Sequence, residues 1–249
     1  MARLWDPFIH SISRHFRMGR SRLFLRVLPD FNELKVCDLG GSSHFWEKVE
    51  SRAIPRDLTL LNVRLDGQSE NYAADSTRRI LLYDGEIIPF DDGHFDVTVC
   101  NSVIEHVPVA HRGGFVAELL RTSQYFFIQT PAYVFPVEPH FVFPALHWLP
   151  RPIARRLVRF GLWNLLSRPS AEHRDRYFEE VHLLTLAEFR AYFPGATLHT
   201  ETVFGIPKSY ILHGESARIL EANPVIRPAL QSAPASAPSS AGAAQRCEA

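Results

Sequence analysis

The sequence predicts an α/β fold centred on a doubly wound, mostly parallel sheet, and three observations support this prediction. Short runs of consecutive apolar residues recur through the middle of the chain, which is typical of strands buried on both faces. Helical patterns alternate with the first of these runs, as in βαβ units. The 249 residues are 46% hydrophobic and 22% charged, a composition that allows a sizeable core. Ligands of such sheets bind beyond the carboxyl ends of the strands, so candidate site residues are sought there.

The N-terminal segment, residues 1–33, interleaves apolar side chains with arginines and predicts one or two helices that form a cap. Its apolar stripe either packs on the domain, with arginine stems along the border, or covers the active site or meets anionic lipid. The whole chain has 27 basic and 27 acidic residues. This balance gives no overall field that would favour nucleic acid, so no nucleic-acid partner is expected.

The apolar runs predict the strands of the sheet in order. They lie at residues 36–39, 58–63, 80–83, 95–100, 125–129, 197–204 and 208–213. Residues 112–123 fit a crossover helix between the fourth and fifth strands. Thr185 and Glu188 have the spacing of a capping box and predict a helix over 185–193. The last two strands are separated by a short turn with Gly205, which predicts an antiparallel hairpin at the sheet edge.

Residues 131–180 interrupt this alternation and are rich in proline and aromatic residues. A helix is expected over 153–166, where arginines stand among apolar residues. We expect this helical and aromatic insertion after the fifth strand to cover the substrate as a lid, within a domain that spans 34–215. From about Pro224 the chain turns to Ala, Pro and Ser, which predicts a disordered tail over 224–249.

The cysteines and the chain's apolar segments bear on metal binding and location. Cys37, Cys100 and Cys247 have the spacing of neither metal ligands nor a disulfide framework, so no metal site is predicted. The N-terminus lacks the pattern of a secretory signal, and no apolar run is long enough to span a bilayer. We expect a cytoplasmic protein, with residues 147–166 as a candidate contact with a membrane surface.

The first strand ends in a short glycine loop, where Asp38 precedes Gly40 and Gly41. A glycine turn lets the backbone come close to a ligand. An acid before the glycines suits a cationic aminoacyl group better than a pyrophosphate. A structural turn that binds no ligand is the alternative for this loop.

Residues 84–106 are the most informative stretch. They begin with the segment DGEIIPF, pass through an acidic turn into the strand at 95–100, and end with NSVIEH. Asp84 offers an acceptor for an amine, and Ile87 and Ile88 offer apolar walls for a purine. The alternative is an Asp-Gly turn between two buried strands. Together with the glycine loop, this order of segments resembles class I S-adenosylmethionine (SAM) methyltransferases of the ubiquinone and small-molecule type.

The resemblance implies a Rossmann-like, seven-strand sheet with an antiparallel last strand and SAM as the cofactor. In it, Asp84 would accept a hydrogen bond from the adenine amine, and Asn62 would bind the ribose, with Asp66 as an alternative. The residues implied for the cofactor, from the adenine to the aminoacyl end, are Asp84, Gly85, Asn62, Asn101, Asp38, Gly40 and Gly41.

The chain also departs from the family pattern. Ser42 and His44 stand where the loop's later glycines would be, and Asn62 replaces the usual ribose-binding acid. A rival interpretation is therefore a non-catalytic, Rossmann-like SAM-binding protein. A nicotinamide-dependent dehydrogenase is the least favoured, because the three-glycine fingerprint is absent.

Three side chains are candidate catalytic groups. His106 is the imidazole nearest to the expected methyl position, while Glu138 and His140 belong to the insertion. A general base is needed when the acceptor is a hydroxyl or a protonated amine. Alternatively, Glu105 and His106 only fix the start of a helix, and the polar groups of the insertion are merely solvated. The predicted function is methyl transfer from SAM to an O or N atom of a small-molecule, glycan or lipid-linked acceptor.

Overall fold

A computed structural model describes residues 2–64, 78–223 and 226, with side chains described from residue 14 onward. The predicted tail at 224–249 lies outside the described residues, apart from Ile226. Asp66, the alternative ribose ligand, lies outside them as well.

Seven strands form one sheet, in the order β3-β2-β1-β4-β5-β9-β8. They are β1 (Lys35–Leu39), β2 (Asp57–Asn62), β3 (Arg78–Leu82), β4 (Phe95–Asn101), β5 (Ser123–Pro131), β8 (Thr197–Val203) and β9 (Ile206–Glu215). The first five pair in parallel, whereas β9 is antiparallel to both β5 and β8. The predicted fold class is confirmed. The last strand in sequence lies inside the sheet, and β8 forms the edge.

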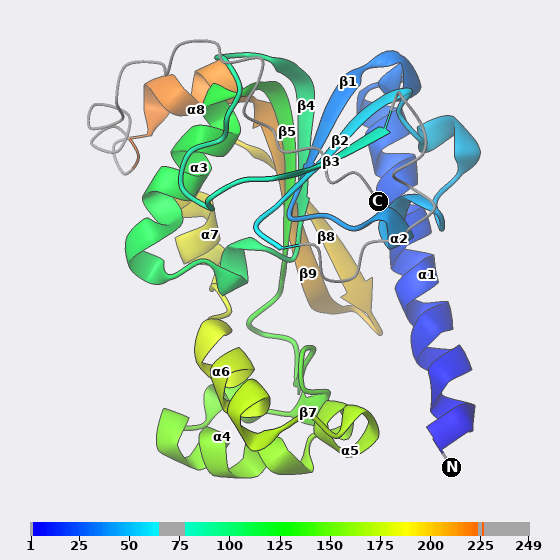
Figure 1. The fold of residues 1–249 in the computed structure, drawn as a ribbon, viewed down its shortest axis with the longest axis vertical. Helices are drawn as coiled ribbons and strands as arrows, with labels where there is room; N and C mark the ends of the chain where they lie inside the picture. The colour runs from blue at the N-terminus through cyan, green and yellow to red at the C-terminus, as the bar shows by residue number, and fades with distance from the viewer. Residues whose placement is uncertain (1, 65–77, 224–225, 227–249) are drawn as a thin grey trace.

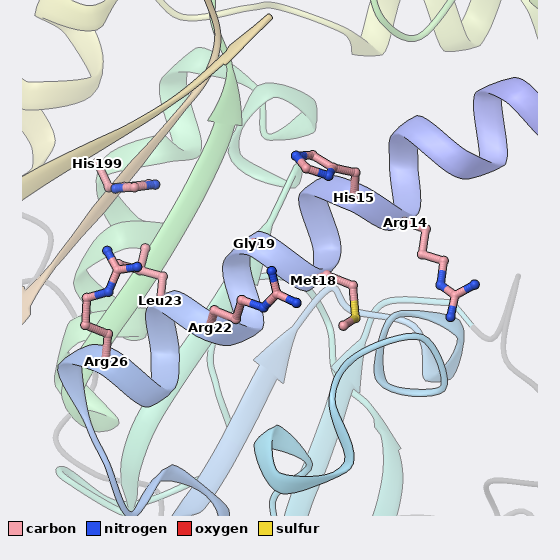
Figure 2. A pocket seen from close by; sticks show the side chains of 8 residues that line it. All are labelled: Arg14, His15, Met18, Gly19, Arg22, Leu23, Arg26 and His199. Carbon is pink, nitrogen blue, oxygen red and sulfur yellow. The ribbon is translucent and has the colours of Figure 1, made fainter.

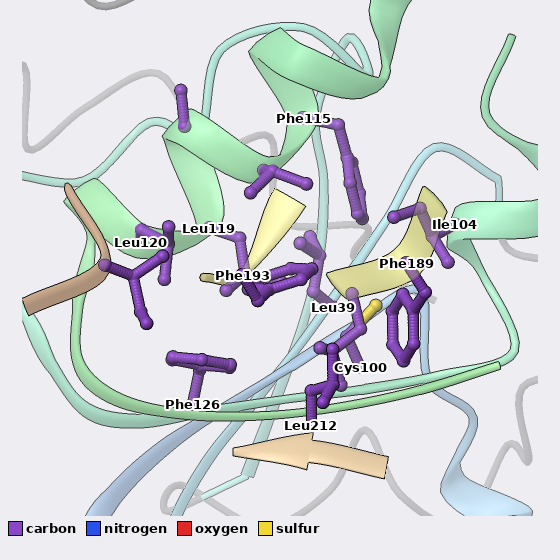
Figure 3. Packing of buried hydrophobic residues seen from close by; sticks show 14 of the residues in the cluster. Leu39, Cys100, Ile104, Phe115, Leu119, Leu120, Phe126, Phe189, Phe193 and Leu212 are labelled. Carbon is purple, nitrogen blue, oxygen red and sulfur yellow. The ribbon is translucent and has the colours of Figure 1, made fainter. Parts of the chain in front are cut away.

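Helices cover both faces of the sheet (Figure 1). On one face lie α3 (Arg112–Arg121), α7 (Leu186–Tyr192) and α8 (Ser216–Ala222), and on the other lie α1 (Ala2–Val27) and α2 (Ser43–Trp46). Successive residues of a strand point to opposite faces. Phe126 of β5 therefore packs against Phe193 in the larger core (Figure 3), while Phe127 packs against Phe24 of α1. The sheet is thus buried on both sides.

The insertion forms a lobe beyond the carboxyl end of β5 (Figure 1). Its elements are β6 (Val137–Glu138), β7 (Phe143–Pro144), α4 (Arg151–Leu157), α5 (Leu162–Ser167) and α6 (Ala171–Glu180). The lobe has its own hydrophobic cluster, which consists of Phe141, Leu146, Ala154, Val158 and Phe178. These side chains fix the lobe's internal packing, so the residues between β5 and α7 are ordered by a core separate from that of the sheet.

Several predicted helices differ from those observed. The single helix expected over 153–166 is wrong, because the chain breaks at Gly161, where an added Cβ would lie 2.6 Å from the carbonyl oxygen of Phe141. The helix expected after residue 101 is only a 3₁₀ turn, Ile104–His106. α6 and α8 were not predicted, and α6 buries a single residue, Phe178. The capping box is confirmed: the side chain of Thr185 accepts a hydrogen bond from the backbone N–H of Glu188, and the side chain of Glu188 accepts one from the backbone N–H of Thr185.

Among the described residues, no helix combines the length and the apolar character that a membrane crossing requires. Whether the lobe contacts a membrane surface depends on its exposed side chains, which are described below.

Candidate cofactor and active site

Asp38 lies near the end of β1, where its side chain is fully buried. Its Oδ2 accepts a hydrogen bond of 2.8 Å from the indole Nε1 of Trp46, on α2. Its Oδ1 has no hydrogen-bond partner among the described residues. Burial raises the pKa of Asp38 to about 7, and the bond from Trp46 opposes this rise. The carboxyl group therefore retains one acceptor atom for a donor that the protein itself does not supply.

The glycine loop closes tightly over this carboxyl group. A Cβ on Gly41 would lie 1.8 Å from Oδ2 of Asp38, and one on Gly40, whose φ is +72°, would lie 2.6 Å from the side chain of Val103. Asn62, the last residue of β2, donates a hydrogen bond of 2.9 Å from Nδ2 to the carbonyl oxygen of Gly41. The loop thus tolerates no side chain at these glycines, and Asn62 holds it against β2.

Asp84 follows β3 and caps a turn of its own. Its Oδ1 accepts hydrogen bonds from the backbone N–H groups of Glu86 and Ile87, at 2.8 and 2.9 Å. Gly85 provides the left-handed conformation in this turn, with φ of +88°. Ile87 is exposed, but Ile88 is in the core, so the prediction of Ile88 as a wall for a purine is wrong.

The turn after Asp84 is tied to helix α3. Glu118 accepts a hydrogen bond of 2.9 Å from the backbone of Ile88 and forms a two-point ion pair with Arg121. Arg121 also donates to the carbonyl oxygens of Ile88 and Phe90. These contacts hold residues 84–90 in place without using the exposed side chain of Asp84.

Asn101, the last residue of β4, occupies the next carboxyl end along the sheet. Its Oδ1 accepts a long hydrogen bond of 3.4 Å from Arg20 of α1, and its Nδ2 is buried with no partner among the described residues. Arg20 also forms a two-point ion pair with Glu201 of β8. Because Asp38 pairs with Val99 in the sheet register, Asn101 lies two residues further along β4, beside the glycine loop.

A buried group of carboxylates and imidazoles lies beyond β4 and β5. Nε2 of His140 is 3.8 Å from Oε1 of Glu105, and its Nδ1 is 2.7 Å from Oε1 of Glu138. The ring of His106 packs edge-on against His140, with centroids 4.9 Å apart. Ligand atoms of Glu105, His106 and His140 all lie within 4.8 Å of one another. The structure thus brings the three predicted catalytic residues together and adds Glu105. We name these four residues the Glu-His cluster.

The electrostatics of this cluster differ from residue to residue. Burial lowers the pKa of His106 to about 4, with a further contribution from His140. Burial opposes the charge of His140, but Glu138 and Glu105 outweigh it and raise the pKa of that imidazole. Burial raises the pKa of Glu105, against the influence of His140. At neutral pH, His106 is therefore an uncharged imidazole, whereas the neighbouring carboxylates favour the charged form of His140.

Two cavities lie near these groups. One, of about 200 Å³, lies within the lobe and is lined by Tyr133, Glu138, Phe141, Leu146, His147, Leu149, Arg151, Ala154, Phe178, Val181, His182 and Leu183. It reaches the Glu-His cluster at Glu138. The other, of about 530 Å³, runs along α1 and is basic (Figure 2). Arg14, Arg22 and Arg26 line it, and none of the predicted site residues does.

Sequence reasoning missed some of the residues that shape the site. Trp46 and Arg20 complete the surroundings of Asp38 and Asn101, and no spacing in the sequence links these pairs. Glu105 belongs to the recognised NSVIEH segment, but its burial beside His140 depends on the lobe. Tyr133 and His147 contact each other, with Nε2 of His147 2.8 Å from the carbonyl oxygen of Tyr133.

Comparisons with known proteins agree with this geometry. Residues 41–124 match the family model of a methyltransferase domain. A chain in the complex between the Haloferax volcanii Trm112 methyltransferase activator and the putative methyltransferase is similar in structure, with a TM-score of 0.51 and 14% identity over 82% of this chain and 90% of that one. A chain titled putative Zn-dependent alcohol dehydrogenase from Rhodobacter sphaeroides has a TM-score of 0.54 and 15% identity, over 78% and 87% of the two chains. A comparison with curated proteins gave no match.

At these identities the structural likenesses show the fold, while the family match supplies the class. The resemblance seen in the sequence is confirmed at the level of the fold and of a methyltransferase domain model that matches residues 41–124. The matched residues resemble a methyltransferase domain and include Gly41, β2, β3, β4 and α3.

The buried carboxyl group of Asp38 predicts a particular pH dependence of stability. Its pKa of about 7 in the folded protein exceeds the value near 4 of an unfolded chain, so the folded state holds the proton more tightly. The stability that this group contributes is complete below about pH 4 and is lost as the pH rises to about 7. Asp38→Asn cannot ionise and retains an oxygen for Trp46.

We therefore expect the variant to gain stability relative to the wild-type protein, on the order of 3 kcal/mol, between about pH 5 and pH 8. Urea unfolding of both proteins at several pH values measures this difference. A difference in free energy of unfolding that does not change with pH would contradict the prediction.

Proposed function

We propose that the protein binds SAM at the carboxyl ends of β1, β2, β3 and β4 and transfers its methyl group to an oxygen or nitrogen atom of an acceptor. The acceptor would be a small molecule, a glycan or a lipid-linked compound. One observation carries the proposal: near the ends of two adjacent strands, Oδ1 of Asp38 and Nδ2 of Asn101 are buried and have no hydrogen-bond partner among the described residues, and Glu105 of the Glu-His cluster follows β4.

The aminoacyl end of SAM fits the first of these strand ends. Oδ1 of Asp38 is a buried acceptor that suits an ammonium group, and Nδ2 of Asn101 is a buried donor that suits a carboxylate. Buried polar atoms rarely remain without a partner, so a ligand that supplies both groups is favoured. Gly40 and Gly41 keep the space between these residues free of side chains.

The adenosine end fits the next two strands. Asn62 uses its Nδ2 to hold the glycine loop, which leaves the oxygen of the same amide as the group for a ribose hydroxyl. Asp84 uses Oδ1 within its turn, and its other oxygen would accept from the adenine amine, with Ile87 against the ring. An Asp-Gly turn at residues 84–85 was the alternative to adenine binding. Because Asp84 uses one oxygen in the turn and keeps the other, the turn is compatible with adenine binding.

The chemistry requires a nucleophile on the acceptor in line with the methyl group. Bound SAM supplies an electrophilic methyl carbon, and the electron pair of the breaking C–S bond remains on sulfur. The Glu-His cluster would take the proton that a hydroxyl acceptor loses as its oxygen bonds to carbon. The lobe would exclude water and position the acceptor, which alone supplies a large part of the rate.

The surface of the lobe supports a lipid-linked acceptor. Within residues 147–166 it exposes five large apolar side chains near arginines of α4, namely Trp148, Ile153, Phe160, Leu165 and Leu166. Apolar side chains interspersed with cations suit the interface of an anionic bilayer. We propose that residues 147–166 bring the active site to a membrane surface.

Binding of SAM is the primary test. We expect calorimetry to detect binding to the wild-type protein, and Asp84→Asn to weaken it about tenfold or more, because a charge-assisted hydrogen bond is lost. Asn retains the acceptor oxygen for the backbone of residues 86 and 87, so the turn should survive. Asp91→Asn, in the adjacent acidic turn, is the matched control and should bind SAM normally. No heat with millimolar SAM would refute the proposed function.

Variants of the lobe should separate catalysis from SAM binding. We expect Glu138→Gln and His140→Asn each to lower kcat about 100-fold or more, because the group that takes the acceptor proton is disturbed. Their affinity for SAM should stay within about twofold of the wild-type value, since neither residue lies at the cofactor strands. His111→Asn, at an exposed position before α3, is the control.

An acceptor screen with labelled SAM provides the turnover for these measurements. Saturable SAM binding with no transfer to any acceptor would favour the alternative, a non-catalytic SAM-binding protein. The residues that replace the usual glycines and the ribose acid motivate that alternative.

Sedimentation with liposomes tests the membrane contact. We expect the protein to sediment with vesicles that contain anionic lipid at low salt, and the double variant Phe160→Ser and Leu165→Ser to lose most of this binding. Val109→Ser, which removes another exposed apolar side chain outside the lobe, should bind as the wild-type protein does. If the double variant sediments with anionic vesicles as well as the wild-type protein does, the proposed membrane contact of residues 147–166 is refuted.

A further inference from the structure

We propose that Glu105, His106 and His140 form a binding site for a divalent transition-metal ion of the zinc class. Metal binding follows from the ligands alone, whereas its role in catalysis rests on the proposed function. The sequence predicts no metal site, because the cysteines lack metal spacing and the three ligands come from two distant segments of the chain.

The three side chains have the composition and spacing of an open metal site. Two imidazoles and one carboxylate are a common set in catalytic zinc sites, which leave the fourth position to water or substrate. For metal–ligand bonds of about 2.1 Å, tetrahedral ligand atoms are about 3.4 Å apart. Here the ligand atoms lie within 4.8 Å of one another, and Nε2 of His140 is 3.8 Å from Oε1 of Glu105. Small side-chain rotations would complete the site.

Glu138 provides the outer contact that metal-bound histidines usually have. Its Oε1 is 2.7 Å from Nδ1 of His140, and its Oε2 accepts a hydrogen bond of 2.7 Å from the backbone N–H of Phe141. This arrangement fixes the imidazole with its Nε2 directed at Glu105. A carboxylate that accepts from one ring nitrogen orients the other toward a metal and increases its basicity.

The Glu105 oxygen that accepts no hydrogen bond from the described residues is a second, independent observation. The side chain of Glu105 is 0% exposed, and Oε1 has no hydrogen-bond partner among the described residues. Its Oε2 accepts from Thr130 at 3.2 Å, so this carboxyl group is held from one side only. A buried carboxylate oxygen without a donor is costly, and a metal ion is a partner that would satisfy it.

The charges around the site favour a bound metal cation in addition to the imidazole of His140, which lies between two carboxylates. Glu105 and Glu138 are both buried, and among the described residues His140 is the one basic side chain within ion-pair distance of them. Arg112 acts on Glu105 only electrostatically and donates its hydrogen bonds to the carbonyl oxygens of Val107 and His182. A divalent ion would offset both carboxylates and leave His140 neutral, as a ligand must be.

The position of the site defines the acceptor that it would serve. It lies after the carboxyl end of β4, between the proposed SAM pocket and the cavity of the lobe at Glu138. A metal ion there would bind the oxygen of a hydroxyl acceptor and lower its pKa, so that the oxygen reaches the methyl group as the stronger nucleophile. The acceptor class is therefore a compound with a hydroxyl group, or two adjacent oxygens, that can bind a metal.

Titration with Co²⁺ tests the site directly, since Co²⁺ replaces zinc and has visible absorption bands that report its coordination. The experiment uses the full-length, untagged protein with Cys247→Ser, which removes the one thiol outside the described residues. We expect one Co²⁺ per chain, with a band typical of four or five ligands and displacement by Zn²⁺.

Glu105→Gln and His106→Asn should each abolish this spectrum. Glu138→Gln should weaken Co²⁺ binding about 10- to 100-fold, as the loss of an outer-shell carboxylate does. His111→Asn should bind as the parent does. Because a buried variant can misfold, each is first shown to unfold cooperatively and to bind SAM as the parent does. No saturable Co²⁺ binding by the parent, or an unchanged spectrum in Glu105→Gln and His106→Asn, would overturn the proposal.

Failure of this proposal can be told apart from failure of the proposed function. SAM affinity is measured after treatment with EDTA, and metal affinity is measured without SAM. SAM binding and turnover that persist in EDTA would refute the role of the metal in catalysis and leave the methyltransferase intact, while the Co²⁺ titration alone decides whether the metal site exists. Metal binding without SAM binding would refute the proposed function instead.

Discussion

The carboxyl group of Asp38 is the contact around which the first half of the domain is arranged. It is fully buried at the end of β1, where it receives the indole N–H of Trp46 and lies directly against the backbone of Gly41. Because the loop has to wrap around this group, position 41 tolerates only glycine. Asn62 then fixes the same loop to β2. A single buried acid thus contacts both the loop and α2, and its remaining oxygen is the atom proposed to bind the ammonium group of SAM.

A second buried acid plays a comparable part further along the sheet. Glu105 lies just after β4 and receives a hydrogen bond from Thr130 of β5, while its backbone carbonyl accepts from His182 before α7. Its free oxygen faces His140 in the lobe. The acid therefore joins the sheet to the insertion, and the cost of its burial is met only if something in the site compensates its charge.

The fold was largely readable from the sequence because strands buried on both faces leave continuous apolar runs, as β2, β4 and β5 do. α6 escaped prediction because its charged surface buries only Phe178, and the break at Gly161 depends on the distant carbonyl of Phe141. The family match covers Asn62, Asp84 and Asn101, which belong to local sequence patterns, whereas Asp38 precedes it. The sequence predicted His106, Glu138 and His140 of the Glu-His cluster as candidate catalytic groups. It did not predict their contact with Glu105, since no local pattern reveals that the lobe folds back on residue 105.

The groups proposed for SAM and those proposed for the acceptor belong to different parts of the protein. This separation has a physical consequence for how the acceptor can change in evolution. The groups proposed for SAM belong to the sheet and its turns, whose packing depends on the two large cores. Glu138 and His140 belong to a lobe with a small core of its own. Changes in the lobe can therefore alter the acceptor with little strain on the cofactor strands. The one element that both halves share is Glu105, so any new acceptor must still be compatible with a buried carboxylate at the end of β4.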